Sequence, residues 1–248
     1  MVFGGLTKTS LLDYPEHVAA TLFSKGCNFR CPYCHNSELI PLSGNGPSSA
    51  GGSSSSGEFL ISEEEILSFL KKRAAVLDGV CITGGEPTLW ADLPDFIRKV
   101  RSLDLLVKLD TNGSNPSMLK DLIDEGLLDY VAMDIKNSPA KYIMTAGLSL
   151  SGGRESPLLE KIRTSVSILL EGRIPCEFRT TVVKGFHTKE DFSAIDDLIV
   201  GAERYYIQSY RESDEVIEKD RCSAYNKEEL LELVSDMTKV SPILRGIE

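Results

Sequence analysis

The chain has 248 residues, of which 42% are hydrophobic, and it carries a formal net charge of -10 with a sequence pI near 4.9. That length allows one large domain with its own core, and the apolar runs are too short for a helix that crosses a membrane. The acidic balance argues against a broad surface for nucleic acid or an anionic membrane. We expect the partner to be a small molecule or another protein.

The first ten residues contain no extended apolar stretch ahead of a cleavage site, so a signal peptide is not expected. The sequence therefore predicts a cytoplasmic protein. Thiols stay reduced in that compartment, and clustered cysteines there are more often metal-binding or catalytic than disulfide-bonded.

Short β-rich runs alternate with segments of helical periodicity along almost the whole chain. Strands are predicted at Val18 to Ser24, Val80 to Thr83, Leu105 to Asp110, Tyr130 to Ile135, Cys176 to Val183 and Tyr205 to Ser209. Helices are predicted at Ser62 to Leu77, Leu93 to Leu103, Pro116 to Glu125, Pro157 to Glu171, Lys189 to Val200 and Lys227 to Lys239. Strands with helical crossovers predict an α/β fold with a parallel sheet. Since a closed barrel needs eight units, we expect an open (partial) parallel β/α barrel of about six units, with a flat doubly wound sheet as the alternative.

Residues 43–57 depart from this pattern, because they consist of Ser, Gly, Asn, Pro and Ala and contain almost nothing that could be buried. Such a composition is typical of a flexible linker or long loop. We therefore predict a single domain over residues 1–248 with a flexible Ser/Gly-rich insertion at 43–57.

Polar and reactive residues follow each predicted strand, and in a parallel barrel the C-terminal strand ends form the functional rim. Three cysteines, Cys27, Cys31 and Cys34, follow the first strand within eight residues. Three thiols on one short loop have four readings. The first interpretation is a structural zinc site, which needs a fourth ligand, and the second is a c-type haem attachment site, which belongs to exported proteins. The third is a redox Cys-x-x-Cys pair, which leaves Cys27 unexplained. The fourth is an iron-sulfur site with one iron left open.

The turn Gly84-Gly85-Glu86-Pro87 follows the second strand. In one reading it is a tight turn with a solvated Glu86. In the other, the glycine backbone approaches a ligand closely and Glu86 receives an ammonium group of that ligand. A turn alone does not require an acid between glycine and proline.

Residues two apart on a strand share a face, and this periodicity groups charged residues together. It pairs Lys108 with Asp110, Asp134 with Lys136 and Glu177 with Arg179, while the alternating positions are largely apolar. Because the apolar face of a barrel strand packs on the helices, we expect the charged face to point inward. Buried charges need one another or a polar ligand, and a zwitterion with an amino group, a carboxylate and a ribose would satisfy many of them. Partly exposed strands are the alternative.

The three cysteines, spaced Cys-x3-Cys-x2-Cys, together with the Gly-Gly-Glu-Pro turn at the next strand end, resemble the radical S-adenosylmethionine enzymes. The likeness extends from about Lys8 to Tyr210. Within that superfamily, the residues 8–15, 34–36, 109–113 and 133–136 look like motifs of the glycyl-radical-enzyme activases, above all those that serve anaerobic ribonucleoside-triphosphate reductase.

The resemblance implies one [4Fe-4S] cluster on Cys27, Cys31 and Cys34, with S-adenosyl-L-methionine on the open iron. It places Tyr33 near the adenine, and Gly84, Gly85 and Glu86 at the methionyl amino group. It places Asp110, Thr111, Asp134 and Lys136 around the methionyl carboxylate and ribose, and Arg179 joins them through its inward face.

The activity that the resemblance implies is reductive cleavage of S-adenosylmethionine to a 5'-deoxyadenosyl radical, which makes a glycyl radical on a partner enzyme. No side chain is expected to act as an acid or base. The expected partners are anaerobic ribonucleotide reductase and an electron donor such as flavodoxin or ferredoxin, with no nucleic acid and no membrane. The alternatives are a radical enzyme that modifies a small molecule, similar to 7-carboxy-7-deazaguanine synthase, and a non-catalytic zinc or electron-transfer module.

The remaining cysteines are far apart in sequence, so only one cluster is expected. Cys81 and Cys176 lie on predicted strands and are expected to be small core residues. Cys222 lies in a polar stretch and is expected to be exposed, with an open role. His187 follows the fifth strand, and a surface-loop histidine is the competing reading to a role in the site.

Overall fold

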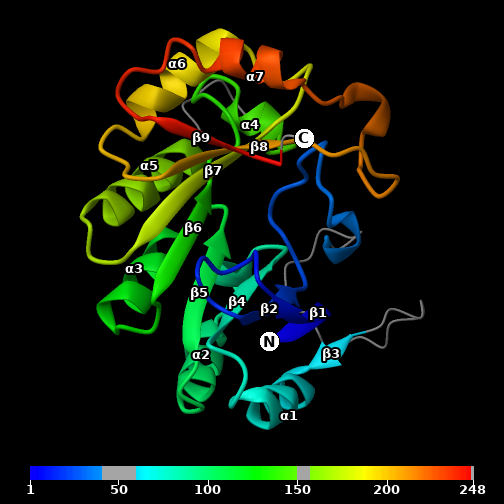
Figure 1. Cartoon of the computed structure of the whole chain (residues 1–248), viewed down its shortest axis with the longest axis vertical. Coiled ribbons are helices and arrows are strands. Elements are labelled where there is room, and N and C mark those ends of the chain that lie inside the picture. The colour runs from blue at the N-terminus through cyan, green and yellow to red at the C-terminus, as the bar shows by residue number, and fades with distance from the viewer. Residues whose placement is uncertain (41–59, 150–156, 247–248) are drawn as a thin grey trace. The chain divides into compact units, whose positions relative to one another are not determined.

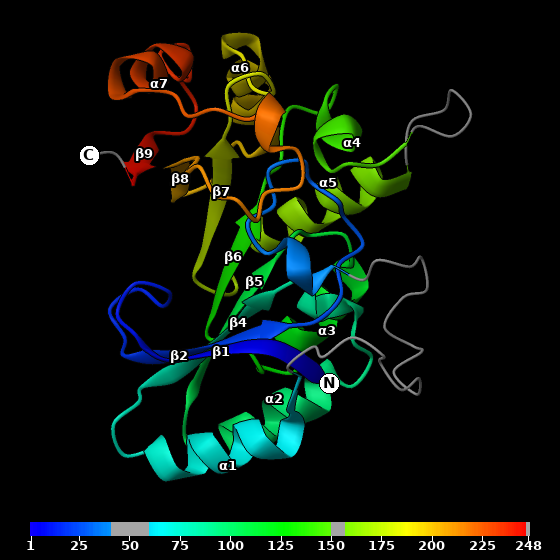
Figure 2. The same cartoon turned by 90° about the vertical axis from the view of Figure 1, so that its right-hand side faces the viewer.

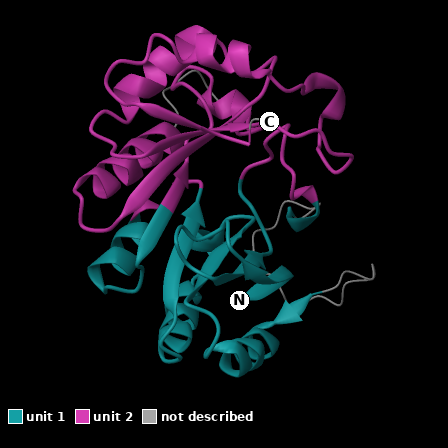
Figure 3. Ribbon diagram, viewed as in Figure 1, with its two compact units in different colours: residues 1–28, 38–111, 117–131 teal, residues 29–37, 112–116, 132–248 magenta. Residues whose placement is uncertain are grey.

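The computed structural model describes residues 1–40, 60–149 and 157–246. The chain divides into two compact units, coloured separately in Figure 3. Unit 1 comprises residues 1–28, 38–111 and 117–131, and unit 2 comprises residues 29–37, 112–116 and 132–248. The predicted insertion at 43–57 lies outside the described residues.

The strands of unit 1 are β1 (Val2–Ser10), β2 (Ala19–Ser24), β3 (Ile61–Ser62), β4 (Gly79–Gly84) and β5 (Leu106–Thr111). β1 pairs antiparallel with both β2 and β3, whereas β2, β4 and β5 are parallel to one another. In the register of β2 and β4, Ser24 lies opposite Gly84. The cysteine-containing segment and the glycine turn therefore leave adjacent strands at the same edge of the sheet.

The helices of unit 1 are α1 (Glu63–Arg73), α2 (Leu93–Arg101) and α3 (Pro116–Asp124), whose first residue belongs to unit 2. α1 begins with a capping box between Ser62 and Glu65. α2 buries residues 93, 96, 97 and 100, the spacing of one helical face. Figures 1 and 2 show α1 and α2 side by side along the strands of unit 1.

The strand β6 (Tyr130–Asp134) begins in unit 1 and ends in unit 2. Unit 2 continues with β7 (Cys176–Val182), β8 (Tyr205–Ser209) and β9 (Pro242–Arg245). β8 pairs in parallel with β7 on one side and with β9 on the other. Its helices are α4 (Tyr142–Thr145), α5 (Pro157–Leu170), α6 (Lys189–Leu198) and α7 (Lys227–Leu233). Short 3-10 turns lie at Ser37–Leu39, Pro87–Leu89 and Lys219–Arg221.

The predicted α/β class is confirmed. The strand order is β3-β1-β2-β4-β5-β6-β7-β8-β9, with different strands at the two ends, so the described sheet is open rather than closed. All six predicted strands and all six predicted helices are present within a few residues, although α7 ends well before Lys239. The sequence reading missed β1, β3, β9 and the short helix α4. In the described part of the chain, no helix is both long and apolar enough to span a membrane.

Candidate functional site

The first half of the cysteine loop in unit 2 is held by the end of α4. The amide of Arg30, just ahead of Cys31, donates to the carbonyl of Ala146 at 2.9 Å. The next residue, Gly147, has a positive φ of 70°, and a Cβ there would lie 1.9 Å from the Arg30 carbonyl oxygen. Only glycine allows this close approach, so the backbone ahead of Cys31 is seated against α4.

The second half of the same loop is held by the segment after β8. The amide of Glu218 donates to the carbonyl of Pro32 at 2.8 Å, and Nε2 of His35 lies 2.7 Å from the carbonyl of Arg211. The hydroxyl of Ser37 donates to the carbonyl of Glu215 at 2.5 Å. The segment 211–218 thus runs along the loop that carries Cys31 and Cys34.

Cys31 itself is buried, whereas Cys34 is partly exposed. Burial raises the pKa of the Cys31 thiol to about 11, and nearby Lys136 is the strongest influence in the opposite direction. A thiol of this kind is protonated when no cation is present and loses its proton when it binds a metal.

Cys27 belongs to unit 1, where its neighbour Gly26 is tied to the glycine turn. The carbonyl of Gly26 accepts a hydrogen bond from the amide of Glu86 at 2.8 Å, and Gly85 donates to Ser24 at 2.9 Å. A Cβ on Gly85 would lie 2.0 Å from the Gly26 carbonyl oxygen. Gly85 therefore has to be glycine for the turn to reach the backbone beside Cys27.

The side chain of Glu86 is completely buried, so the reading of a solvated turn carboxylate is wrong. Its Oε1 accepts from the Thr88 amide at 3.1 Å, from the Thr88 hydroxyl at 2.5 Å and from the Thr111 hydroxyl at 2.8 Å. The sequence reading missed Thr88, although an acid two residues ahead of it, with Pro87 between them, is a helix-start signal. The buried carboxylate places negative charge directly behind the glycine turn.

The two other predicted residues from β5 face different ways. Asp110 forms an ion pair with Lys108, which is 2% exposed and also lies 3.7 Å from the sulfur of Cys81. Thr111, one residue on, bonds to Glu86 instead. The expectation that inward charges pair with each other is met at this strand.

The charged residues of unit 2 form a triad across β6 and β7. Lys136 Nζ lies 2.9 Å from one oxygen of Asp134, and Nε of Arg179 donates to the other oxygen at 3.0 Å. Their side chains are between 14% and 31% exposed. The triad therefore brings two cationic side chains and one carboxylate within hydrogen-bonding distance of one another.

Burial by itself would raise the pKa of Asp134, but Arg179 and Lys136 outweigh it and hold that pKa well below its usual range. Burial would likewise lower the pKa of Lys136, and the negative partners led by Asp134 reverse that effect and raise it. All three members of the triad are therefore charged at neutral pH. The fourth inward charge predicted on these strands, Glu177, forms a two-point ion pair with Arg245 on β9.

Tyr33, between two of the cysteines, is buried and reaches this triad. Its hydroxyl donates to the carbonyl of Lys136 at 3.4 Å, and its ring contacts Phe186 edge-on. Burial raises the pKa of Tyr33 well above its usual value, so the hydroxyl remains protonated.

The predicted site residues fall into two sets. Unit 1 contains Cys27, Gly84, Gly85, Glu86, Asp110 and Thr111, and unit 2 contains Cys31, Tyr33, Cys34, Asp134, Lys136 and Arg179. In unit 1 a hydrogen bond joins Glu86 and Thr111, and in unit 2 hydrogen bonds join Tyr33, Asp134, Lys136 and Arg179. No three His, Cys, Asp or Glu side chains among the described residues are gathered as a metal-binding group.

Two expectations for residues outside these sets are corrected. Cys222 is buried rather than exposed. His187 is also fully buried and is no surface-loop histidine. Cys81 is a core residue as expected, whereas Cys176 is only partly buried.

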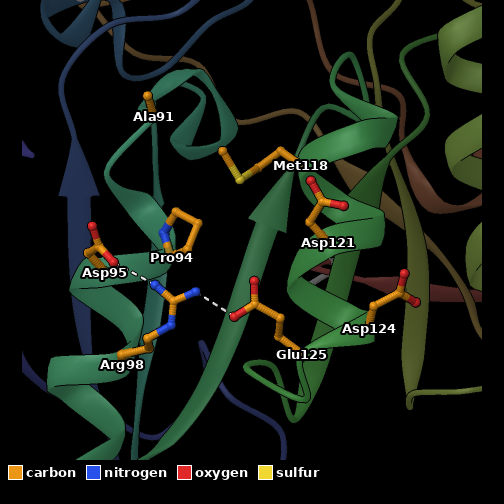
Figure 4. A pocket seen from close by; sticks show the side chains of 8 residues that line it. All are labelled: Ala91, Pro94, Asp95, Arg98, Met118, Asp121, Asp124 and Glu125. Carbon is orange, nitrogen blue, oxygen red and sulfur yellow. Dashed lines mark hydrogen bonds and ion pairs between the residues drawn. The ribbon is translucent and has the colours of Figure 1, made fainter.

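A groove of about 450 Å³ lies between α2 and α3 (Figure 4) and contains none of the predicted residues. Arg98 spans it, with ion pairs of 2.5 Å to both Asp95 and Glu125. Asp121 and Asp124 add further negative charge to its wall. Arg98, Asp95 and Glu125 are between 46% and 71% exposed and Arg98 pairs with both acids, which is typical of a solvated helix surface.

The sequence profile described as the Radical SAM superfamily matches residues 21–199 of the chain. A protein of Methanocaldococcus jannaschii, provisionally named a glycyl-radical enzyme activating enzyme, is 31% identical over 211 residues, which is 85% of this chain and 80% of that protein. A protein of Halobacterium salinarum, provisionally named a GTP 3',8-cyclase, is 36% identical over 103 residues, 41% of this chain and 26% of that protein.

Among solved structures, Streptococcus suis SuiB bound to S-adenosylmethionine has a TM-score of 0.63 at 14% identity, covering 90% of this chain and 49% of that one. TYW1 with a lysine-pyruvate adduct has a TM-score of 0.58 at 18% identity, covering 88% of this chain and 72% of that one. These likenesses support the open barrel fold. The chain belongs to the Radical SAM superfamily, whose members use a [4Fe-4S] cluster and S-adenosylmethionine.

Proposed function

We propose that this chain is a glycyl-radical enzyme activating enzyme. The observation that carries the proposal is the 31% identity to the Methanocaldococcus jannaschii protein of that provisional name, because it extends over most of both chains. The motif Cys34-His35-Asn36, the run 109–113 and the run 133–136 resemble the activases in the same region.

We assign Cys27, Cys31 and Cys34 as the ligands of the family's [4Fe-4S] cluster. Three thiolates on one short loop are suitable donors for such a cluster, and they leave one iron open. Bound together, cluster and S-adenosylmethionine supply the radical chemistry of the family. The chain's own residues hold, orient and shield the cofactor.

We assign the Asp134, Lys136 and Arg179 triad to the anionic part of S-adenosylmethionine, since ammonium and guanidinium groups form charge-assisted hydrogen bonds to carboxylates. The turn of Gly84 and Gly85 then approaches the methionyl amino group, and the buried charge of Glu86 favours a cation there. Asp110 and Thr111 complete this set in unit 1, and Tyr33 provides an apolar surface for the adenine.

The proposed protein partner is anaerobic ribonucleoside-triphosphate reductase, with a flavodoxin or ferredoxin as electron donor. This choice rests on the resemblance of the motifs. The test is to incubate the reconstituted, reduced chain with S-adenosylmethionine and the reductase, and to record an electron paramagnetic resonance spectrum. A glycyl doublet on the reductase is expected, and it should be missing when Cys31→Ala replaces the wild type.

A small-molecule radical enzyme is the second candidate, because of the similarity to the Halobacterium salinarum protein. That similarity covers less than half of either chain, so it supports the shared cofactor chemistry more than the substrate. Cofactor cleavage that requires GTP or another nucleotide, without a doublet on any glycyl radical enzyme, would favour this candidate over the first.

A further inference from the structure

His187 follows β7 in unit 2, and the cofactor assignment gives it no role. It is fully buried, five residues beyond the end of the strand at Val182. Its own carbonyl accepts a hydrogen bond of 2.7 Å from the hydroxyl of Tyr225. Burial and this backbone hydrogen bond hold the residue in place, so the partners of its ring can be identified.

Both ring nitrogens of His187 have backbone partners, and these define the tautomer. Nε2 lies 2.9 Å from the carbonyl oxygen of Lys136, which can only accept, so Nε2 carries the hydrogen. Nδ1 lies 3.2 Å from the amide of Val183, which donates, and 3.4 Å from the carbonyl oxygen of the same residue, which already accepts from the amides of Phe186 and His187 at 3.1 Å. We therefore assign the hydrogen to Nε2 and none to Nδ1. Burial lowers the pKa of His187, which agrees with a neutral ring.

The Lys136 carbonyl is a shared acceptor. It receives the Nε2–H of His187 and, at 3.4 Å, the hydroxyl of Tyr33. The rings of His187 and Tyr33 also meet edge-on, with centroids 6.2 Å apart, and Phe192 of α6 packs against the imidazole. One imidazole therefore connects the segment after β7 with Lys136, two residues beyond β6, and with the aromatic residue of the cysteine loop.

We propose that His187 is a positioning residue of the S-adenosylmethionine site, whose neutral Nε2–H tautomer fixes the Lys136 backbone and the Tyr33 ring. The proposal rests on the cofactor assignment above. The ring nitrogens face backbone groups and the ring meets Tyr33, so the effect of His187 passes through the Lys136 backbone and Tyr33.

The test compares two variants, each of which can keep the hydrogen bond at only one of the two ring-nitrogen positions. In His187→Gln the terminal amide can donate at the place of Nε2, whereas in His187→Asn the shorter amide can reach only the place of Nδ1. We expect His187→Gln to bind S-adenosylmethionine within about threefold of the wild type, and His187→Asn about tenfold more weakly. His17→Asn, in unit 1, is the matched control and should bind as the wild type does.

Binding is measured by calorimetry on anaerobically reconstituted protein, with iron, sulfide and the thermal midpoint recorded for each variant. Equal affinity of both His187 variants with the wild type overturns the proposal, and so does a loss that follows their thermal midpoints. If the wild type holds a full cluster and binds no S-adenosylmethionine, the cofactor assignment fails together with this inference. Normal wild-type binding with unaffected variants removes this inference alone.

A second readout is independent of the cofactor. The chain has three histidines, so nitrogen-15 NMR of histidine-labelled protein resolves them, and His187→Gln identifies one. We expect an unprotonated Nδ1 and a protonated Nε2 for His187 between pH 6 and 8. The opposite tautomer, or protonation of the ring near its ordinary pKa of about 6.5, would contradict the geometry.

Discussion

Replacing Gly85 by alanine tests how the glycine turn supports the backbone beside Cys27. The new Cβ would lie 2.0 Å from the Gly26 carbonyl oxygen and 2.6 Å from its carbon. An ordinary contact begins near 3.4 Å, so the two backbones must separate by about 1.4 Å. Both atoms are backbone, and no flexible side chain can move aside to accommodate the methyl group.

That separation has a cost that can be worked from the contacts. Overpacking at a tight position typically costs about 1–3 kcal/mol, and the 2.8 Å hydrogen bond from Glu86 to Gly26 is weakened by the same movement, at about 1 kcal/mol. We expect a loss of about 2–4 kcal/mol in the free energy of unfolding. The urea slope grows with chain length, so a value near the upper end of the usual range, about 3 kcal/mol per molar, applies to this chain, and the midpoint should fall by about 1 M.

The assay is urea unfolding of the cluster-free protein, followed by iron determination after reconstitution. Gly5→Ala in the same unit is the matched control, because its Cβ would meet Phe23 at an ordinary 3.4–3.6 Å. The control should keep its midpoint and its iron, while Gly85→Ala loses both in part. A Gly85→Ala variant that equals Gly5→Ala in both measurements would refute the argument from close approach.

Three further predictions concern the cysteines and the triad. Cys31→Ala should lose most of its iron and sulfide, whereas Cys222→Ala should keep both; chemical analysis after anaerobic reconstitution decides, and iron retained in Cys31→Ala counts against the ligand assignment. Arg179→Gln should weaken S-adenosylmethionine binding by roughly 10- to 100-fold, since a hydrogen bond to a charged group contributes about 1.5–3 kcal/mol, and Arg179→Lys should lose less; calorimetry that shows equal losses speaks against a charge effect. Asp134 has a lowered pKa, so its stabilising contribution is present above its unfolded pKa of about 3.9 and is lost as pH falls toward the folded value. The unfolding free energy of the wild type should exceed that of Asp134→Asn above about pH 5, with a gap that shrinks below pH 4; a gap independent of pH is the contrary result.

The parallel strands could be predicted because each is a short apolar run bounded by turn residues, and the alternation with helices defines the class. β1 was missed because Val2–Ser10 contains two adjacent glycines and pairs antiparallel at the side of the sheet. β9 begins with a proline and is short, and β3 has two residues. Such short or glycine-containing strands form because an adjacent strand pairs with them, and the pattern of a single sequence does not show which strand is adjacent.

The site was predictable where its residues are close in sequence, as with the cysteine loop and the pairing of Asp134 with Lys136. Strand periodicity also indicated that Arg179 faces inward, and the structure pairs it with Asp134. The burial of Glu86 was not predictable, because Thr111, which bonds to it, lies 25 positions away. For His187, the backbone carbonyl of Lys136 is the decisive partner, and a backbone group leaves no signal in the sequence.

The most direct test of the proposed function traces the hydrogen atom that is removed from the glycine of the partner enzyme. Anaerobic ribonucleotide reductase is prepared with α-deuterated glycine and incubated with the reduced chain and S-adenosylmethionine, and the 5'-deoxyadenosine is analysed by mass spectrometry. Deuterium in that product, together with a glycyl signal on the reductase, is the predicted result. Formation of 5'-deoxyadenosine without deuterium from this or any other glycyl radical enzyme would contradict the activase assignment.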